Sequence, residues 1–128
     1  MRFSIIIPAK NEMQNLQRTL PQFEALKGVF EYELIVADGA STDGTIELAR
    51  SKGARVEVKT KIERETIGEG RNRGAHVATG DILVFLDAGV MVKDIVNFFQ
   101  VIQATFAHAS VVAAVPKVNI DPTEATFS

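Results

Sequence analysis

The sequence predicts an α/β fold, with a mostly parallel central sheet and helices on both of its faces. Short runs rich in β-branched residues alternate with longer amphipathic stretches, the order expected of βαβ units. The runs 34–37, 82–86 and 111–115 are apolar at every position, as in strands buried on both faces. A chain of 128 residues, 46% of them apolar, is long enough for one domain with a sizeable core.

The apolar runs place five strands. We expect Pro8 to end the first of them, because proline cannot continue the ladder of a central strand. The expected strands lie near residues 3–8, 33–38, 54–58, 82–87 and 111–116.

Four helices fit between and after these strands, at residues 12–26, 43–52, 67–79 and 93–107. Apolar residues at three- and four-residue spacing give the first and the last a core-facing stripe. The expected N-terminal caps are Asn11, then one of Ser41, Thr42 and Asp43, then Thr66 in a capping box with Glu69. Gly53 and Gly80 are the expected stops of the second and third helices.

Past Pro116 the pattern fades, and the sequence reaches Ser128 without a further cap or strand signal. We therefore expect residues 1–128 to form a single domain that is truncated at its C-terminus relative to a longer protein. Such a truncation would expose apolar surface, which makes a homodimer one expected state.

Composition excludes several classes of function. Without cysteine there are no disulfides, thiolate nucleophiles or cysteine-zinc sites. A net charge of −2 gives no basic footprint for nucleic acid. Since no apolar run approaches the roughly 20 residues of a membrane span, we expect a cytoplasmic protein, either free or peripheral at the inner face of a membrane.

Acidic residues follow three of the apolar runs. Glu12 comes shortly after the run 3–7, Asp38 directly after 34–37, and Asp87 directly after 82–86. The carboxyl ends of parallel strands share one edge of the sheet, where ligands bind. The three carboxylates are thus predicted to converge on one site.

Glu12 and the segment that begins at Asp38 also have purely structural interpretations. Glu12 can simply complement the dipole of the helix that follows it, and the segment 38–45 can simply be a turn in which Asp43 caps a helix. The functional alternative for this segment has Asp38 accepting hydrogen bonds from a base or a ribose, with Gly39 allowing the backbone to lie close to a ligand.

The glycine-rich segment 68–74 carries two arginines. Arg71 and Arg73 can hold a diphosphate through forked hydrogen bonds, or can simply be solvated on a helix. The spacing of the glycines matches a dinucleotide-binding fingerprint only weakly. The mixed charges of residues 59–65 indicate a solvated loop, and His76 and His108 are interpreted as structural.

Taken together, these segments resemble the inverting glycosyltransferase family 2, which has the GT-A fold. The resemblance spans roughly residues 3–92, with the motifs in the family's order and spacing. The segments that carry it are Ser4–Glu12, Ile35–Thr45, Arg71–Gly74 and Gly80–Ala88.

The resemblance implies a nucleotide-diphospho-sugar, most simply a UDP-sugar, bound in this N-terminal half of a transferase that acts on an acceptor hydroxyl. Glu12 and Asp38 would contact the nucleoside, Arg71 the diphosphate, and Asp87 the ribose and a divalent metal, Mg²⁺ or Mn²⁺. Pro8 and Gly39 would complete the binding site.

Two departures from the family pattern limit this expectation. Gly89 stands where the family's Asp-x-Asp motif has its second aspartate, so Asp87 would hold a metal alone or with substrate phosphates. The family's general base lies in a C-terminal half that is absent from this sequence, so no catalytic residue is nominated. A non-catalytic nucleotide-sugar-binding module and a nucleotidyltransferase-like domain are the alternatives.

Overall fold

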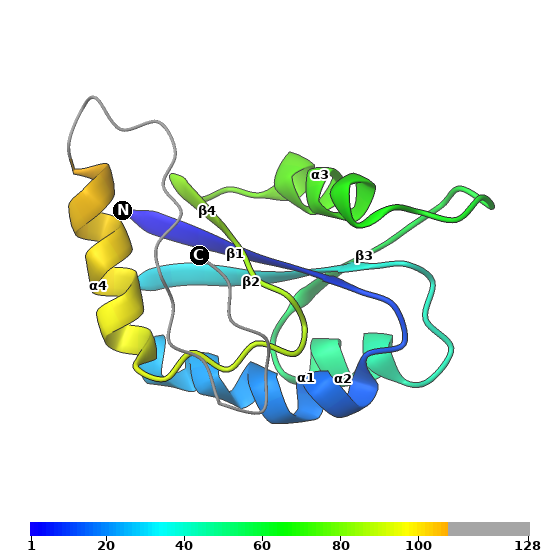
Figure 1. Ribbon diagram of the computed structural model, residues 1–128, viewed down its shortest axis with the longest axis horizontal. Coiled ribbons are helices and arrows are strands. Elements are labelled where there is room, and N and C mark those ends of the chain that lie inside the picture. The colour runs from blue at the N-terminus through cyan, green and yellow to red at the C-terminus, as the bar shows by residue number, and fades with distance from the viewer. Residues whose placement is uncertain (108–128) are drawn as a thin grey trace.

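A four-stranded, fully parallel sheet forms the centre of the computed structural model, which describes residues 1–107 (Figure 1). The strand order is β3-β2-β1-β4, so the first strand of the chain lies inside the sheet. This confirms the predicted α/β class. The strands are β1 (Arg2–Ala9), β2 (Glu31–Asp38), β3 (Arg55–Val58) and β4 (Ile82–Phe85).

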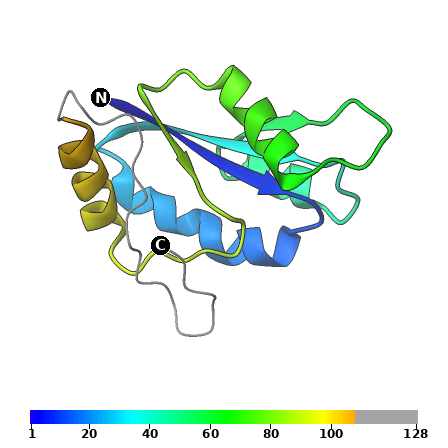
Figure 2. The same cartoon turned by 45° about the horizontal axis from the view of Figure 1, so that its top comes forward.

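Helices cover both faces of the sheet, as predicted. Helix α3 (Ile67–Val77) lies on one face, and the other helices pack on the opposite face (Figures 1 and 2). These are α1 (Met13–Thr19), the 3-10 helix η1 (Leu20–Leu26), α2 (Thr45–Ser51) and α4 (Ile95–Phe106). No helix in residues 1–107 is long and apolar enough to cross a lipid bilayer.

The main core lies between the sheet and the larger group of helices. Alternate residues of β1, Phe3, Ile5 and Ile7, belong to it, and Phe3 makes edge-to-face contacts with Phe30 and Phe99. On the other face, Ile6 packs against Gly74 of α3, and Ser4 lies against Gly80 in the segment that follows this helix. Both faces of β1 and β2 are therefore buried, which explains the continuous apolar run at 34–37.

Strand β4 departs from this prediction. It ends at Phe85 and is an edge strand, with β1 as its only neighbour in residues 1–107. Ile82 and Val84 are buried, whereas Leu83 and Phe85 are 39% and 40% exposed on the face that α3 leaves uncovered. The predicted strand at 111–116 lies outside the described residues.

Pro8 does not end β1, contrary to prediction. The strand continues to Ala9, and Pro8 pairs with Ala37 of β2. The pairing of β1 with β4 stops at Ile6, so Pro8 has a neighbouring strand on one side only. A proline is tolerated there because the ladder loses no hydrogen bond on the open side.

The helix predicted at 12–26 is divided. The α-helix ends at Thr19 and η1 follows, with Pro21 in its first turn. Proline removes a backbone donor and its ring crowds the preceding turn, which ends the α-helix. Asn11 is not the cap either: it has φ +52°, Glu12 occupies the cap position, and the Asn11 side chain accepts a hydrogen bond from the Thr42 amide at 2.8 Å.

The other helix ends agree more closely with the sequence. Thr66 and Glu69 form the predicted capping box of α3, and Gly53, at φ +85°, follows the last turn of α2. The predicted N-cap of α2 is wrong: Gly44, at φ +98°, occupies that position rather than Ser41, Thr42 or Asp43. Asp43 precedes it and accepts hydrogen bonds from Thr45 and, at 3.2 Å, from the Met13 amide, so that this carboxylate joins α1 to α2.

A half-buried carboxylate, that of Glu33, joins segments at the end of the sheet opposite the cleft-side loops. Glu33 on β2 accepts hydrogen bonds from the Ser4 hydroxyl at 2.5 Å and from the amide and hydroxyl of Thr79 at 2.6 and 2.8 Å. Burial raises the pKa of Glu33, but these hydrogen bonds outweigh it and leave that pKa below its usual value. Glu33 thus joins β1 and β2 to the segment that leads from α3 to β4.

The close approach of α3 to the sheet predicts the effect of Gly74→Ala. A Cβ at Gly74 would lie 2.6 Å from Ile6 Cγ2, so the helix must shift outward. We expect a loss of about 1–3 kcal/mol in the free energy of unfolding, measured by urea denaturation. The control is Gly68→Ala in the same helix, where the nearest atom is 3.9 Å away. An equal loss in both variants would contradict the packing explanation.

The pKa of Glu33 predicts a dependence of stability on pH. Because the folded-state pKa is lowered, the contribution of Glu33 is present above the ordinary value of 4.5 and is lost as pH falls through the folded-state pKa. Glu33→Gln should therefore reduce the free energy of unfolding near neutral pH. The difference from the parent should shrink in acid, and a difference independent of pH would count against this role.

Candidate donor-binding cleft

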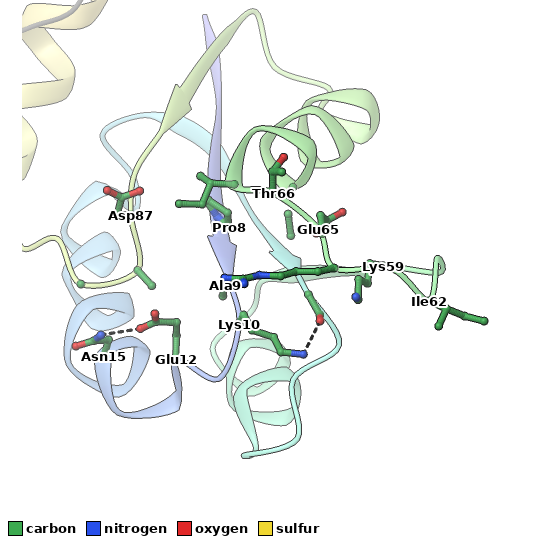
Figure 3. A pocket seen from close by; sticks show the side chains of 17 residues that line it. Pro8, Ala9, Lys10, Glu12, Asn15, Lys59, Ile62, Glu65, Thr66 and Asp87 are labelled. Carbon is green, nitrogen blue, oxygen red and sulfur yellow. Dashed lines mark hydrogen bonds between the residues drawn. The ribbon is translucent and has the colours of Figure 1, made fainter.

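A cleft of about 780 Å³ lies at the carboxyl ends of β1, β2 and β4, between the start of α1 and the start of α3 (Figure 3). Its position agrees with the general location of ligand sites in parallel sheets. The lining residues are Pro8, Ala9, Lys10, Glu12, Asn15, Ala37, Gly39, Lys59, Ile62, Arg64, Glu65, Thr66, Ile67, Gly70, Asp87, Ala88 and Gly89.

Four of the six predicted site residues line this cleft: Pro8, Glu12, Gly39 and Asp87. Glu12 and Asp87 come from loops more than seventy residues apart in the sequence, and parallel pairing of β1 with β4 brings them to one edge. Asp38 and Arg71 are not part of the lining. The predicted convergence of three carboxylates therefore holds for two of them in this structure.

The Asp38 carboxylate is turned into its own loop. The side chain is completely buried and accepts two hydrogen bonds from Ser41, from the amide at 2.7 Å and from the hydroxyl at 2.6 Å. The carboxylate thus closes the turn that begins at Gly39. The part of this turn that faces the cleft is Gly39, whose backbone a ligand can approach closely.

The loops after β1 and β2 are joined to each other across this turn. The Lys10 ammonium group donates to the carbonyls of Gly39 and Ala40 at 3.0 and 3.1 Å, and the Asn11 amide donates to the Ser41 hydroxyl at 2.8 Å. Asn11 and Ala40 both adopt positive φ, of 52° and 68°. Such backbone is rare outside glycine, and this loop pair maintains it through its own hydrogen bonds.

Glu12 lies at the junction of the first loop and α1. Its amide donates to the Thr45 hydroxyl at 3.0 Å, and its carboxylate accepts from the Asn15 amide group at 2.6 Å (Figure 3). Both side chains line the cleft. Glu12 therefore occupies a helix start and a cleft wall together, and its carboxylate keeps free acceptor positions for a ligand.

Asp87, which lines the cleft, forms an ion pair with Arg71 of α3, which does not. The shortest separation between the guanidinium and the carboxylate is 3.4 Å, with the side chains 43% and 59% exposed. A pair this open to water is weak and is easily exchanged for a ligand. Arg71 Nε is buried and has no hydrogen-bond partner, so this guanidinium has an unused donor.

Side chains of α1 and η1 hold the loop that carries Asp87. The buried Thr19 hydroxyl donates to the Ala88 carbonyl at 2.7 Å, and the Arg18 guanidinium donates to the Gly89 carbonyl at 3.0 Å. Gln22 donates to the Val90 carbonyl at 2.8 Å and accepts from the Val92 amide. The position of Asp87 is thereby fixed through the backbone that follows it.

The residues around Asp87 do not form a metal site by themselves. Divalent cations of the Mg²⁺ and Mn²⁺ type prefer several oxygen ligands. Asp87 offers one carboxylate and shares it with Arg71, and Gly89 offers no side chain. Across residues 1–107, no three histidine or acidic side chains are grouped closely enough to hold a metal ion.

The segment 59–66 is a cleft wall, although its charge pattern predicted a solvated loop. Lys59, Ile62, Arg64, Glu65 and Thr66 all line the cleft. The signal was available, since this segment follows β3 and parallel strands share one edge.

The prediction of a solvated loop is confirmed for residues 60–64, which are exposed, and is wrong for Glu65. Its side chain is only 11% exposed, and it pairs with Arg73 at 2.8 Å. Arg73 is therefore engaged within the fold rather than solvated. His76 lies exposed on α3 and is not part of the cleft lining, while His108 lies outside the described residues.

Most charged groups of the cleft already have partners. Lys10 and Lys59 donate to backbone carbonyls, and Glu65 is paired. Arg64 lines the cleft with no hydrogen bond or ion pair to any residue of 1–107. Its guanidinium is therefore available to an anionic ligand.

Comparison with known proteins places the sequence among glycosyltransferases. Residues 4–126 match the family described as "Glycosyl transferase family 2". The glycosyltransferase YfnE of Bacillus subtilis is 38% identical over 99 residues, which is 75% of this chain and 25% of the relative. The dolichol-phosphate mannosyltransferase of Pyrococcus furiosus is 34% identical over 91 residues, 69% of this chain and 26% of the relative.

Solved structures of similar fold include two that contain nucleotide and metal. Glucosyl-3-phosphoglycerate synthase of Mycobacterium tuberculosis, in complex with Mn²⁺, UDP and glucosyl-3-phosphoglycerate, has a TM-score of 0.61 at 30% identity, covering 70% of this chain and 34% of that one. The mannosyltransferase PcManGT of Pyrobaculum calidifontis, in complex with GDP-Man and Mn²⁺, has a TM-score of 0.61 at 26% identity, covering 73% and 29%. The chain thus spans about a quarter to a third of the length of these proteins.

The cleft geometry predicts that Gly89→Asp creates a cation site. A Cβ at Gly89 has ordinary contacts, the nearest at 3.7 Å to Asn15, so a carboxylate fits beside Asp87. We expect Mn²⁺ affinity to rise about tenfold or more, because each added charged oxygen ligand tightens binding. Calorimetric titration with Mn²⁺ measures this. Gly89→Asn is the matched control of equal size, and an equal gain in both variants would contradict a carboxylate ligand.

Proposed function

Since the chain belongs to glycosyl transferase family 2, we propose that its cleft binds a nucleotide-diphospho-sugar and forms the donor site of an inverting glycosyltransferase. The observation that carries this proposal is the meeting of Glu12, Gly39 and Asp87 in one cleft at the carboxyl edge of the sheet. The cleft volume of about 780 Å³ is within the range of small-molecule sites. Family membership also favours this function over the nucleotidyltransferase-like alternative.

The nucleotide would lie along the loops after β1 and β2. Glu12 and Asp87 supply carboxylate acceptors for ribose hydroxyls, and Gly39 allows the nucleoside to contact the backbone. Arg71, which has an unused donor and a weak partner, would turn from Asp87 toward the diphosphate. A UDP-sugar is the first choice of donor, because the mycobacterial synthase was solved with UDP; a GDP-sugar is the second, by analogy with the mannosyltransferase.

Asp38 contributes to this site through the loop that it closes. Its carboxylate holds Ser41 and is buried beneath the turn, so that Gly39 faces the cleft. Direct contact with a base would require this turn to open. We therefore assign Asp38 the ordering of the nucleoside-binding loop rather than a contact in the closed structure.

Sugar transfer with inversion requires a base that removes the proton of the acceptor hydroxyl. Among the described cleft carboxylates, Glu65 is engaged with Arg73, and Glu12 and Asp87 are assigned to the nucleotide. The base and the acceptor site belong, on this proposal, to the rest of a longer protein. The residues of this chain bind and orient the donor, and no step of their action is assigned to a metal ion.

A non-catalytic nucleotide-sugar-binding module is the second candidate function. The observation that favours it is the single carboxylate at the metal position, with Gly89 beside it. Both functions require donor binding, and they differ in turnover. Because the base and the acceptor site are assigned to the rest of a longer protein, the assay uses that longer protein: release of the nucleoside diphosphate from UDP-glucose or GDP-mannose supports the transferase, and binding without release supports the module.

Donor binding is tested first by thermal shift with nucleoside diphosphates and sugar nucleotides, with and without Mn²⁺. A ligand at 100 times its dissociation constant should stabilise the folded chain by about 2.7 kcal/mol, which raises its melting temperature. Asp38→Ala should remove most of this shift, because the loop then loses the acceptor for Ser41.

The companion variant Ser41→Ala separates the two roles of Asp38. If Asp38 acts through the turn, Ser41→Ala should weaken binding as well, since it removes one of the two hydrogen bonds. If the carboxylate instead contacts the base, Ser41→Ala frees it and binding should be retained or improved. The absence of a shift with every nucleotide tested would overturn the proposed function itself.

A further inference from the structure

Arg73 joins four parts of the chain beside the cleft. From α3 it donates two hydrogen bonds to the Glu65 carboxylate, at 2.8 and 2.9 Å. It also donates to the Asp38 carbonyl at the end of β2, at 2.9 Å, and to the Glu57 carbonyl of β3. We call these four hydrogen bonds the Arg73 clamp.

The clamp is more enclosed than the other ion pairs near the cleft. The side chains of Arg73 and Glu65 are 23% and 11% exposed, against 43% and 59% for Arg71 and Asp87. The hydrogen bonds from Arg73 hold the pKa of Glu65 below its usual value. Forked, charge-assisted bonds of this kind fix direction as well as distance, so the clamp fixes where Glu65 lies.

The close packing of α3 on the sheet lets Arg73 reach its hydrogen-bond partners. Gly70 and Gly74 both face the sheet, and added Cβ atoms would lie 3.6 Å from Pro8 Cβ and 2.6 Å from Ile6 Cγ2. At Gly70 the added atom would also lie 3.4 Å from the Glu65 carboxylate. The two glycines therefore let the helix approach the strand ends, and they leave room for Glu65 over its first turn.

Arg64 is adjacent to the clamped residue and is the cleft cation that has no partner in residues 1–107. The segment before it is fixed less firmly, by the Lys59 side chain on the Glu63 carbonyl and by Lys61 on Glu69, both exposed. Arg64 therefore lies between a weakly held segment on its N-terminal side and the firmly held Glu65 on its C-terminal side.

We infer that the Arg73 clamp is a positioning device that presents Arg64 to the diphosphate of the bound donor. The inference rests on the proposed donor site and adds to it a phosphate-binding residue, Arg64, with two positioning residues, Glu65 and Arg73. A diphosphate is the ligand that fits, because a planar guanidinium binds phosphate oxygens in pairs and its strength depends on fixed direction. A cation also offsets the charge that develops on the departing nucleoside diphosphate.

The test compares a nucleoside diphosphate with its nucleoside. In the complete chain, Glu65→Gln removes the charge of the clamp, and Arg64→Ala removes the presented cation. Each variant should weaken UDP binding about tenfold, the amount expected for one charge-assisted hydrogen bond, and should leave uridine binding unchanged. The double variant should bind UDP no more weakly than Arg64→Ala. NMR titration measures both affinities, with GDP and guanosine as a parallel pair.

Glu24→Gln is the matched control, since it removes a Glu from the exposed Lys27–Glu24 pair at η1, which lies outside the clamp and the cleft lining. It should leave both affinities unchanged. Hydrogen exchange gives a readout independent of ligand: amides of residues 59–66 should exchange faster in Glu65→Gln but not in the control. Arg73→Lys, which keeps the charge but loses the fork, should reproduce the effect of Glu65→Gln.

The outcomes separate the two proposals. If the parent chain binds UDP and Glu65→Gln binds it equally well, the clamp inference is wrong and the proposed function stands. Equal weakening of UDP and uridine would assign the clamp a general structural role and overturn the inference. If the parent chain binds no nucleoside diphosphate, both proposals fail, and the exchange rates then report only whether the clamp orders the segment.

Discussion

Helix α3 lies so close to strand β1 that only a glycine fits at position 74, and the arrangement of the cleft depends on this contact. A closely packed α3 brings Arg71 to Asp87 at the edge of the cleft and Arg73 to the ends of β2 and β3. The same contact sets the first turn of α3 over Pro8. If a side chain at position 74 displaced the helix outward, the two guanidinium groups would no longer reach their partners. The packing of α3 on the sheet therefore determines the polar contacts at the edge of the sheet.

The cleft is built mainly by loops that fix one another. The loop after β1 holds the loop after β2 through Lys10 and Asn11, and the buried Thr19 holds the loop after β4. Lys10 and Thr19 donate from their side chains to backbone carbonyls, and Asn11 donates from its backbone amide to the Ser41 hydroxyl. Such bonds satisfy groups that strand ends leave without a ladder partner. Binding groups on these loops are consequently placed by the scaffold before any ligand arrives.

The sequence predicts the sheet well because strands are indicated by short, local patterns of residues. It predicts the cleft less well because the cleft depends on contacts between segments that are distant in the sequence. The continuous apolar run at 34–37 identifies a strand buried on both faces, although the run at 82–86 forms a half-exposed edge strand, and the Thr66–Glu69 spacing identifies a capping box. The residues after each strand could be assigned to one edge, which located Glu12 and Asp87. The direction of the Asp38 side chain and the pairing of Glu65 with Arg73 depend on contacts between separate segments, which periodicity does not encode. Pro21 was a local signal, and its effect on the first helix follows from its missing amide.

Strand β4 gives the chain a property that concerns its handling rather than its chemistry. Within residues 1–107 its outer edge has no ladder partner, and Leu83 and Phe85 lie partly exposed beside that edge. An open edge next to apolar side chains is a template for another strand, whether from the same polypeptide or from a neighbour. The yield of monomeric protein should therefore depend on concentration during folding, and covering this edge becomes the main requirement for studying the domain in isolation.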